Sequence, residues 1–432
     1  MPEAPASSVG KLDLARLFLI ALLFSFSFIS YFDRTIMSIA GPQLMKDFSL
    51  SAMQMGSIYS AFILGYAVFM IPCGQLTDRL GGRLVLALMG ILSAAFTALI
   101  VLGGRPGLGA LVGVMPALFS IRLGLGVVTA PLYPACARIA ANWIPVTYHA
   151  RVQGLVIAGS SLGAAVSPLL FTWMLVQFQW RLSFAIAALV TGSLAALWFW
   201  HARDYPADTR PPERKTPPIS WAQLFTNRNL MLVTFAYGAL GYFQYIFFYW
   251  IYYYFGEVLH LGAQSSARYT TILFLTECAI MPLGGVISDR LTRIYGAQFG
   301  RRVVPMAGLA LSAVFTYAGT VSPGIGGVVT CLSLAVGLAA CCEGPFWAAV
   351  TEMAGEHVGG ASSILNTGAQ IGGMFAPVLT PYVASRAGWS WGLYTGGLIA
   401  ISGVVAVYFA DVRPREVSRA PAAGSQPAAE SA

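Results

Sequence analysis

Charged side chains are scarce in this chain, and their scarcity excludes a soluble domain of ordinary composition. Asp, Glu, Lys and Arg make up 10% of its 432 residues and hydrophobic residues make up 57%, and the mean hydropathy is +0.70. A typical soluble domain has about 25% charged residues. The composition therefore predicts an integral membrane protein whose main partner is the lipid bilayer.

The positions of histidine and cysteine, and the absence of catalytic motifs, exclude further classes of protein. The four histidines fall at expected loops or helix ends, which excludes a buried histidine proton relay. The six cysteines fall in apolar segments without zinc-ligand spacing, so we expect no metal site and no disulfide. The chain contains no HExxH, GxSxG or ATP-binding motif, so we expect neither an enzyme nor a cofactor.

Long apolar segments dominate what is present. A helix needs about 20 residues to cross a bilayer, and twelve segments reach that length. They lie near residues 16–40, 52–77, 82–103, 112–138, 149–175, 181–202, 229–255, 266–288, 302–321, 325–351, 360–385 and 390–411. The sequence thus predicts an all-α protein with twelve transmembrane helices.

The positive charges predict the orientation of these helices. Lysines and arginines gather on the loops and tails that share a side with both termini, and few lie on the other side. By the positive-inside rule both termini are expected in the cytoplasm, with a multi-pass protein in a bacterial-type inner membrane. The net charge of +8 is then a topology signal, and no nucleic-acid partner is needed to explain it.

The two halves of the chain echo each other. Gly159, Gly163 and Pro168 recur 209 residues later as Gly368, Gly372 and Pro377, and GQLTDR recurs as GVISDR 211 residues later. The predicted divisions are a cytoplasmic segment 1–15, a six-helix bundle 16–202, a Pro-rich charged cytoplasmic linker 203–228, a second six-helix bundle 229–411 and a disordered cytoplasmic tail 412–432. Two pseudo-symmetric bundles around a midplane site suit alternating access.

Ionisable residues inside the spans are the first site candidates. Asp33 and Arg34 lie in the first span, and Arg122 lies in the fourth. A charge near the bilayer centre costs about 3 kcal/mol on insertion scales, so it normally faces a polar cavity. The two arginines are candidates to hold a substrate carboxylate. Alternatively, Asp33 and Arg34 form a structural ion pair, and Arg122 only snorkels or pairs near a helix end.

Several motifs resemble one transporter family. Gly74, Asp78, Arg79, Gly81 and Arg83 in GQLTDRLGGR match the cytoplasmic loop signature of the major facilitator superfamily, and Gly285, Asp289 and Arg290 keep it in the second half. YFDR, RLGLGVVTAPLYPACARIAANWIP, EGPFW and ILNTGAQIGG resemble the anion:cation symporter family within it. The resemblance implies proton-driven import of organic anions, typically sugar acids such as galactonate or glucarate. In other members the anions are aromatic or dicarboxylic acids.

Asp33 is the candidate for proton coupling. Burial favours the protonated form of a carboxyl group and a neighbouring arginine favours the ionised form, so the arrival of substrate can change its protonation. Symporters that this chain resembles have a second carboxylate seven residues after the fourth-span arginine. Here that position is Thr129, which cannot titrate. Either one proton moves through Asp33, or Glu343 or Glu277 substitutes. We favour Glu343, in the helix paired with the fourth by duplication, although a structural role for it stays open.

Recognition of a sugar acid also needs hydroxyl and amide groups beside aromatic faces. The candidates are Tyr31, Tyr66, Gln244, Tyr245, Trp250, Asn366 and Gln370. Tyr31, Tyr66 and Asn366 match positions that face the substrate in the resembling family. Ser160, by contrast, replaces a glutamine of some sugar-acid carriers. For Tyr245 and Trp250, stacking on the substrate and a place in the aromatic belt at the membrane interface remain about equal alternatives.

The loop signatures predict a different role. Asp78, Arg79, Arg83, Asp289 and Arg290 are expected to gate the cytoplasmic side by pairing charges near helix ends. The leading function is a proton-coupled symporter for a small organic anion, with the proton as the only coupling ion and the chain acting as a monomer. A uniporter or anion exchanger of the same fold is the alternative. The identity of the anion and the number of protons stay open at this point.

Overall fold

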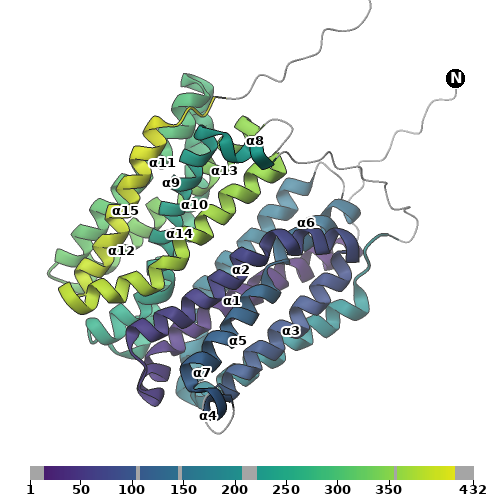
Figure 1. Ribbon diagram of the computed structural model, residues 1–432, viewed down its shortest axis with the longest axis vertical. Helices are drawn as coiled ribbons and strands as arrows, with labels where there is room; N and C mark the ends of the chain where they lie inside the picture. The colour runs from purple at the N-terminus through teal and green to yellow at the C-terminus, as the bar shows by residue number, and fades with distance from the viewer. Residues whose placement is uncertain (1–13, 104–107, 145–147, 207–220, 355–357, 414–432) are drawn as a thin grey trace, which may run out of the picture.

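The computed structural model describes residues 14–413 apart from 104–107, 145–147, 207–220 and 355–357. Within these ranges all regular elements are helices and no strand occurs (Figure 1). In chain order they are α1 (Leu14–Phe48), α2 (Ala52–Leu80), α3 (Gly82–Leu102), α4 (Leu108–Val112), α5 (Val114–Thr129), α6 (Leu132–Trp143), α7 (His149–His201), α8 (Trp221–Thr226), α9 (Arg228–Tyr253), η2 (Tyr254–Val258), α10 (Gly262–Tyr295), α11 (Ala297–Val321), α12 (Ile325–Ala340), α13 (Glu343–Ala354), α14 (Val358–Ala387) and α15 (Trp389–Phe409).

The number of membrane-length helices agrees with the sequence prediction. Ten helices in the described ranges are long and apolar enough to cross a membrane. One of these, α7, contains two spans, because Gln179 leaves helical geometry with φ 57° and ψ 167°. The 30-residue α14 packs among them against α9 and α2. Counting α7 twice and adding α14 gives twelve, which confirms the predicted helical membrane fold. Helices suit this setting because their backbone groups are satisfied internally.

Three of the expected spans differ in detail from the observed helices, although each still forms one membrane-length segment. The first helix continues to Phe48 through Pro42, beyond its expected end at residue 40. The expected fourth span, 112–138, consists of two helices. Pro131 has no backbone N–H to donate, so the helical hydrogen bonding is interrupted between α5 and α6. The expected tenth span, 325–351, is also two, because Cys341 and Cys342 form a tight turn between α12 and α13.

The structure repeats the duplication seen in the sequence. Gln179 and Gly388 both have positive φ, 57° and 91°, and each immediately precedes a tryptophan, Trp180 or Trp389. A positive φ is uncommon for a residue with a side chain. The same chain reversal therefore occurs at positions 209 residues apart, once with a glycine and once without.

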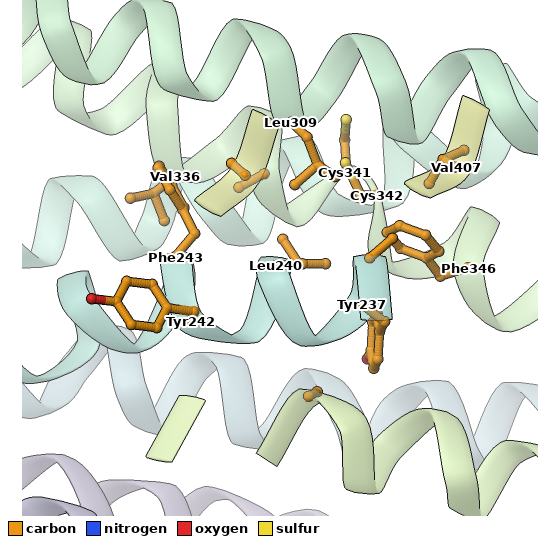
Figure 2. Close-up of a cluster of buried hydrophobic side chains, with 14 of the residues drawn as sticks. Tyr237, Leu240, Tyr242, Phe243, Leu309, Val336, Cys341, Cys342, Phe346 and Val407 are labelled. Atoms are coloured by element: carbon orange, nitrogen blue, oxygen red, sulfur yellow. The ribbon is translucent and has the colours of Figure 1, made fainter. Parts of the chain in front are cut away.

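Each half packs mainly on itself. Helices α1, α2, α3, α5, α6 and α7 form the first half, and α9 to α15 form the second (Figure 1). The core of the second half gathers Leu240 and Phe243 of α9 with Leu309 of α11 and Val336 of α12 (Figure 2). All four side chains are buried.

The halves meet along α2 with α14, α1 with α9 and α7 with α10. Near the start of α2, the Ser60 hydroxyl donates to the Met374 carbonyl at 2.7 Å, and the Tyr59 ring stacks on Tyr249 with centroids 4.9 Å apart. These contacts join the two halves at the end where α2 begins. Farther along this boundary between the halves, the seam, Arg34 of α1 contacts α9 and is linked through it to α14.

Candidate functional site

Arg34 reaches from the first half to the second. Its guanidinium donates a hydrogen bond to the Tyr245 hydroxyl, which donates to Gln370 Oε1 at 2.9 Å. Five aromatic rings surround the guanidinium carbon, with centroid distances of 4.8 Å to Tyr245, 4.9 Å to Phe62, 5.4 Å to Phe248, 5.5 Å to Tyr31 and 5.8 Å to Tyr66. Cation–π attraction in a desolvated site is worth about 2 kcal/mol. Rings and a tyrosine hydroxyl therefore hold this cation.

Arg122 forms a second layer behind Arg34. It is fully buried, donates to the Arg34 carbonyl oxygen at 3.4 Å and lies 4.8 Å from the Phe62 centroid. Its Nε and Nη1 atoms have no hydrogen-bond partner among the described residues. Neither arginine lies within 4.0 Å of a carboxylate in this part of the chain. Neither guanidinium group therefore forms an ion pair at that distance within the described part of the chain.

Asp33 points away from its sequence neighbour. It is 4% exposed, and its Oδ2 accepts a hydrogen bond from Thr191 of α7 at 2.7 Å. Its Oδ1 has no partner among the described groups. A small cavity inside the first half is lined by Asp33, Arg34, Ser93, Thr129 and Thr191, among others. The adjacent charges thus do not form the ion pair that the sequence left open.

Two further carboxylates come from the second half. Glu343 is the first residue of α13 and accepts a hydrogen bond from the Tyr237 hydroxyl, which accepts one from Trp347 Nε1 at 2.9 Å. The Gln244 side chain also bonds to Glu343, and Glu277 of α10 interacts with it electrostatically. The Tyr31 ring lies 5.5 Å from the Arg34 guanidinium carbon, and Tyr31 is within electrostatic range of Glu343.

Two other predicted site residues, Asn366 and Trp250, lie in different places. Asn366 donates from α14 to Met70 Sδ of α2 at 3.2 Å, on the seam between the halves. Trp250 instead donates to the Pro377 carbonyl at 3.1 Å and packs against Tyr59 and Trp389. It belongs to a packing cluster and makes no recorded contact with Arg34.

The predicted gating residues lie at the α2–α3 and α10–α11 turns. In the second half Arg301 donates to Asp289 Oδ1 and Glu352 Oε1, each at 2.6 Å, and Arg290 is exposed. In the first half Arg83 donates its backbone N–H to Asp204 at 2.9 Å, and Arg79 is exposed. The side chain of Asp78 lies outside the described part. The contacts described here stay within one half.

Several residues of this site were not predicted from the sequence. Phe62, Phe248, Thr191 and Tyr237 each contact a charged group named above, and Trp347 donates to the Tyr237 hydroxyl. Four of them are residue types that are common in apolar helices, and nothing in the surrounding sequence distinguishes them from core residues. Trp347 had a signal, because it lies four positions after Glu343 and shares its helix face.

A twelve-helix protein in two related halves, with buried cations at their junction, defines a membrane transporter of the alternating-access class. The sequence profile of the Major Facilitator Superfamily matches residues 23–297 and 294–431. This chain belongs to the Major Facilitator Superfamily, and it is a multi-pass membrane transporter and not an enzyme.

Relatives and solved structures agree with this assignment. The chain is 29% identical to the hexuronate transporter of Bacillus subtilis (strain 168) over 412 residues, 91% of this chain and 94% of that one. It is 26% identical to a protein of Escherichia coli (strain K12) named "Probable L-galactonate transporter", over 90% of this chain and 87% of that one. A bacterial homologue of the human lysosomal transporter Spinster, solved inward-facing and occupied, superposes with a TM-score of 0.75 at 16% identity, covering 93% and 97% of the two chains.

Proposed function

We propose that this transporter imports a small organic carboxylate, a sugar acid of the hexuronate or hexonate kind, together with protons. The observation that carries the proposal is the Arg34–Arg122 pair, two buried guanidinium groups near the junction of the halves with no carboxylate within 4.0 Å among the described residues. A guanidinium binds a carboxylate through two parallel hydrogen bonds. The names of the relatives, a hexuronate and an L-galactonate transporter, support the same substrate class.

Asp33 is the proposed proton-coupling residue. It is buried beside the arginine pair, accepts one hydrogen bond from Thr191 and keeps a second oxygen free among the described groups. A carboxyl group placed this way can exchange a proton without breaking an ion pair. Glu343 is the second candidate, because Thr129 provides no carboxylate in the first half. The proton is the only coupling ion in this proposal, and no cofactor takes part.

The proposed setting is a bacterial inner membrane with both termini in the cytoplasm and the chain acting as a monomer. In that orientation the contacts of Tyr59 and Ser60 close the outer side of the seam. Asp289 and Arg290, two of the proposed gating residues, then lie at the cytoplasmic side, where Asp289 pairs with Arg301 of the same half.

The test is uptake of labelled galacturonate and L-galactonate into proteoliposomes, with and without an inward proton gradient, in the parent protein and in Asp33→Asn. The proposal expects gradient-driven accumulation in the parent, which is lost in Asp33→Asn while exchange of internal for external substrate continues. Asp47→Asn is the matched control, because Asp47 accepts from Trp180 near the end of α1, far along the helix from Asp33. Equal flux with and without the gradient would replace the symporter by a uniporter or exchanger.

A further inference from the structure

The charges around the site are distributed unequally between the two halves. Arg34 and Arg122 both come from the first half. No lysine or arginine occurs between residues 303 and 385, and those of the second half that the structure describes lie at helix ends. The acidic residues Glu277 and Glu343 lie inside this half. One side of the site is therefore cationic, and the other is anionic.

Glu343 is held in place without a cation. It begins the 12-residue α13, where the free N–H groups of a first helical turn favour a negative side chain. The Tyr237 hydroxyl donates to its Oε2, and Trp347 fixes that hydroxyl with a hydrogen bond of 2.9 Å. Tyr237 is 5% exposed, whereas Glu343 is only partly buried. The carboxylate is thus oriented by Tyr237 and Trp347 of its own half, and part of its surface remains exposed.

Tyr31 relates the two groups, because it lies against Arg34 and within electrostatic range of Glu343. The Tyr31 ring lies 5.5 Å from the Arg34 guanidinium carbon and interacts electrostatically with Glu343 and Tyr237. In the binding mode that we infer below, an anion with its carboxylate on Arg34 extends its far end along Tyr31 toward Glu343.

We propose that Glu343 selects organic anions whose far end is neutral and donates hydrogen bonds, so that the transporter takes monocarboxylates in preference to the corresponding dicarboxylates. This inference rests on the proposed function, because it assumes that a carboxylate binds Arg34. A far-end hydroxyl donates to Glu343, whereas a second carboxylate faces a like charge in a low-dielectric site with no compensating cation.

The experiment compares matched ligand pairs bound to the purified full-length protein in detergent. L-Galactonate and galactarate share a six-carbon skeleton and differ in whether carbon six is a hydroxymethyl group or a carboxylate. Benzoate and terephthalate form a second pair for the aromatic alternative. Isothermal titration should give at least about tenfold tighter binding of the monocarboxylate than of its diacid in the pair that binds.

Two variants and one control locate the cause of the preference. Glu343→Gln keeps a hydrogen-bonding side chain and should bring the ratio of the two dissociation constants to within about threefold. Gln244→Lys adds a cation beside Glu343 and should raise the affinity for the diacid. Glu257→Gln is the control, because Glu257 lies in η2 away from the site, and the ratio should not change.

Several results would overturn the proposal. In the parent protein, a diacid that binds as tightly as its monocarboxylate or more tightly would remove the preference, and this comparison requires no variant to fold. An unchanged ratio in a folded Glu343→Gln protein would move the selectivity elsewhere. Failure of all four ligands and of galacturonate to bind would reject the proposed sugar-acid function, and the selectivity of Glu343 with it. Binding without a preference for the monocarboxylate would reject the selectivity alone, so the two failures are distinguishable.

Discussion

Arg34 of α1 and Tyr245 of α9 lie 211 residues apart and hydrogen-bond to each other between the two halves. The same offset relates GQLTDR to GVISDR, so the two residues occupy equivalent places in the first helix of each half. Pseudo-symmetry brings such equivalent positions together where the halves meet. The first half supplies a cation at this place and the second half supplies a ring and a hydroxyl.

Replacing Arg34 by lysine should weaken substrate binding although the charge is kept. Lysine has no planar fork for a carboxylate and stacks less well on the surrounding rings. We expect a loss of about 1.5–3 kcal/mol, roughly tenfold to a hundredfold in the dissociation constant. Titration calorimetry of the transported anion measures it, with the exposed Arg79→Lys as control. Equal affinities in parent and Arg34→Lys would mean that Arg34 does not hold the carboxylate.

Replacing Tyr245 by phenylalanine should isolate the contribution of one hydroxyl. The ring stays over Arg34, but the link from Arg34 to Gln370 is lost. A hydrogen bond of this kind contributes about 0.5–1.5 kcal/mol, so we expect binding to weaken by roughly threefold to tenfold. Tyr242→Phe is the matched control, because its hydroxyl bonds to Thr395 inside the second half. A similar loss in both variants would indicate a general packing effect.

Gly284 and Gly285 offer a test of close helix packing at neighbouring positions. A Cβ at Gly284 would come within 2.7 Å of Cys341 Cα, whereas a Cβ at Gly285 has no heavy atom within 4 Å. Gly284→Ala should therefore lower stability by about 1–3 kcal/mol through overpacking at the α12–α13 break. Gly285→Ala should be neutral or stabilising by up to about 1 kcal/mol. Thermal unfolding in detergent compares them, and identical midpoints would contradict the packing shown here.

Arg301 should stabilise its half through two carboxylates. It is 8% exposed and bonds to Asp289 and Glu352, each at 2.6 Å. Arg301→Ala leaves Glu352 without this donor and should cost about 1–3 kcal/mol, seen as a lower unfolding temperature. Arg290→Ala removes an exposed charge at the neighbouring turn and should have little effect. An equal drop in both variants would count against a specific role of the two ion pairs that Arg301 forms.

Sequence patterns were sufficient to predict the number of membrane-spanning helices and the duplication of the two halves. Apolar segments of spanning length predicted twelve helices, because a bilayer imposes a minimum length on each one. The recurrence of Gly159, Gly163 and Pro168 as Gly368, Gly372 and Pro377 predicted the duplication, which Gln179 and Gly388 repeat in their backbone angles. The breaks at Pro131 and at Cys341–Cys342 were missed, because hydropathy does not register a turn inside an apolar segment.

The sequence by itself determined the class of protein and the presence of Asp33, Arg34, Arg122 and Glu343 inside it, because charges in apolar segments stand out by composition alone. Only the tertiary structure decided what each charge faces. Asp33 and Arg34 are adjacent in the chain, yet successive residues of a helix point in different directions, so one reaches Thr191 and the other reaches Tyr245. The partners come from α7 and α9, and contacts over such separations depend on how the helices pack.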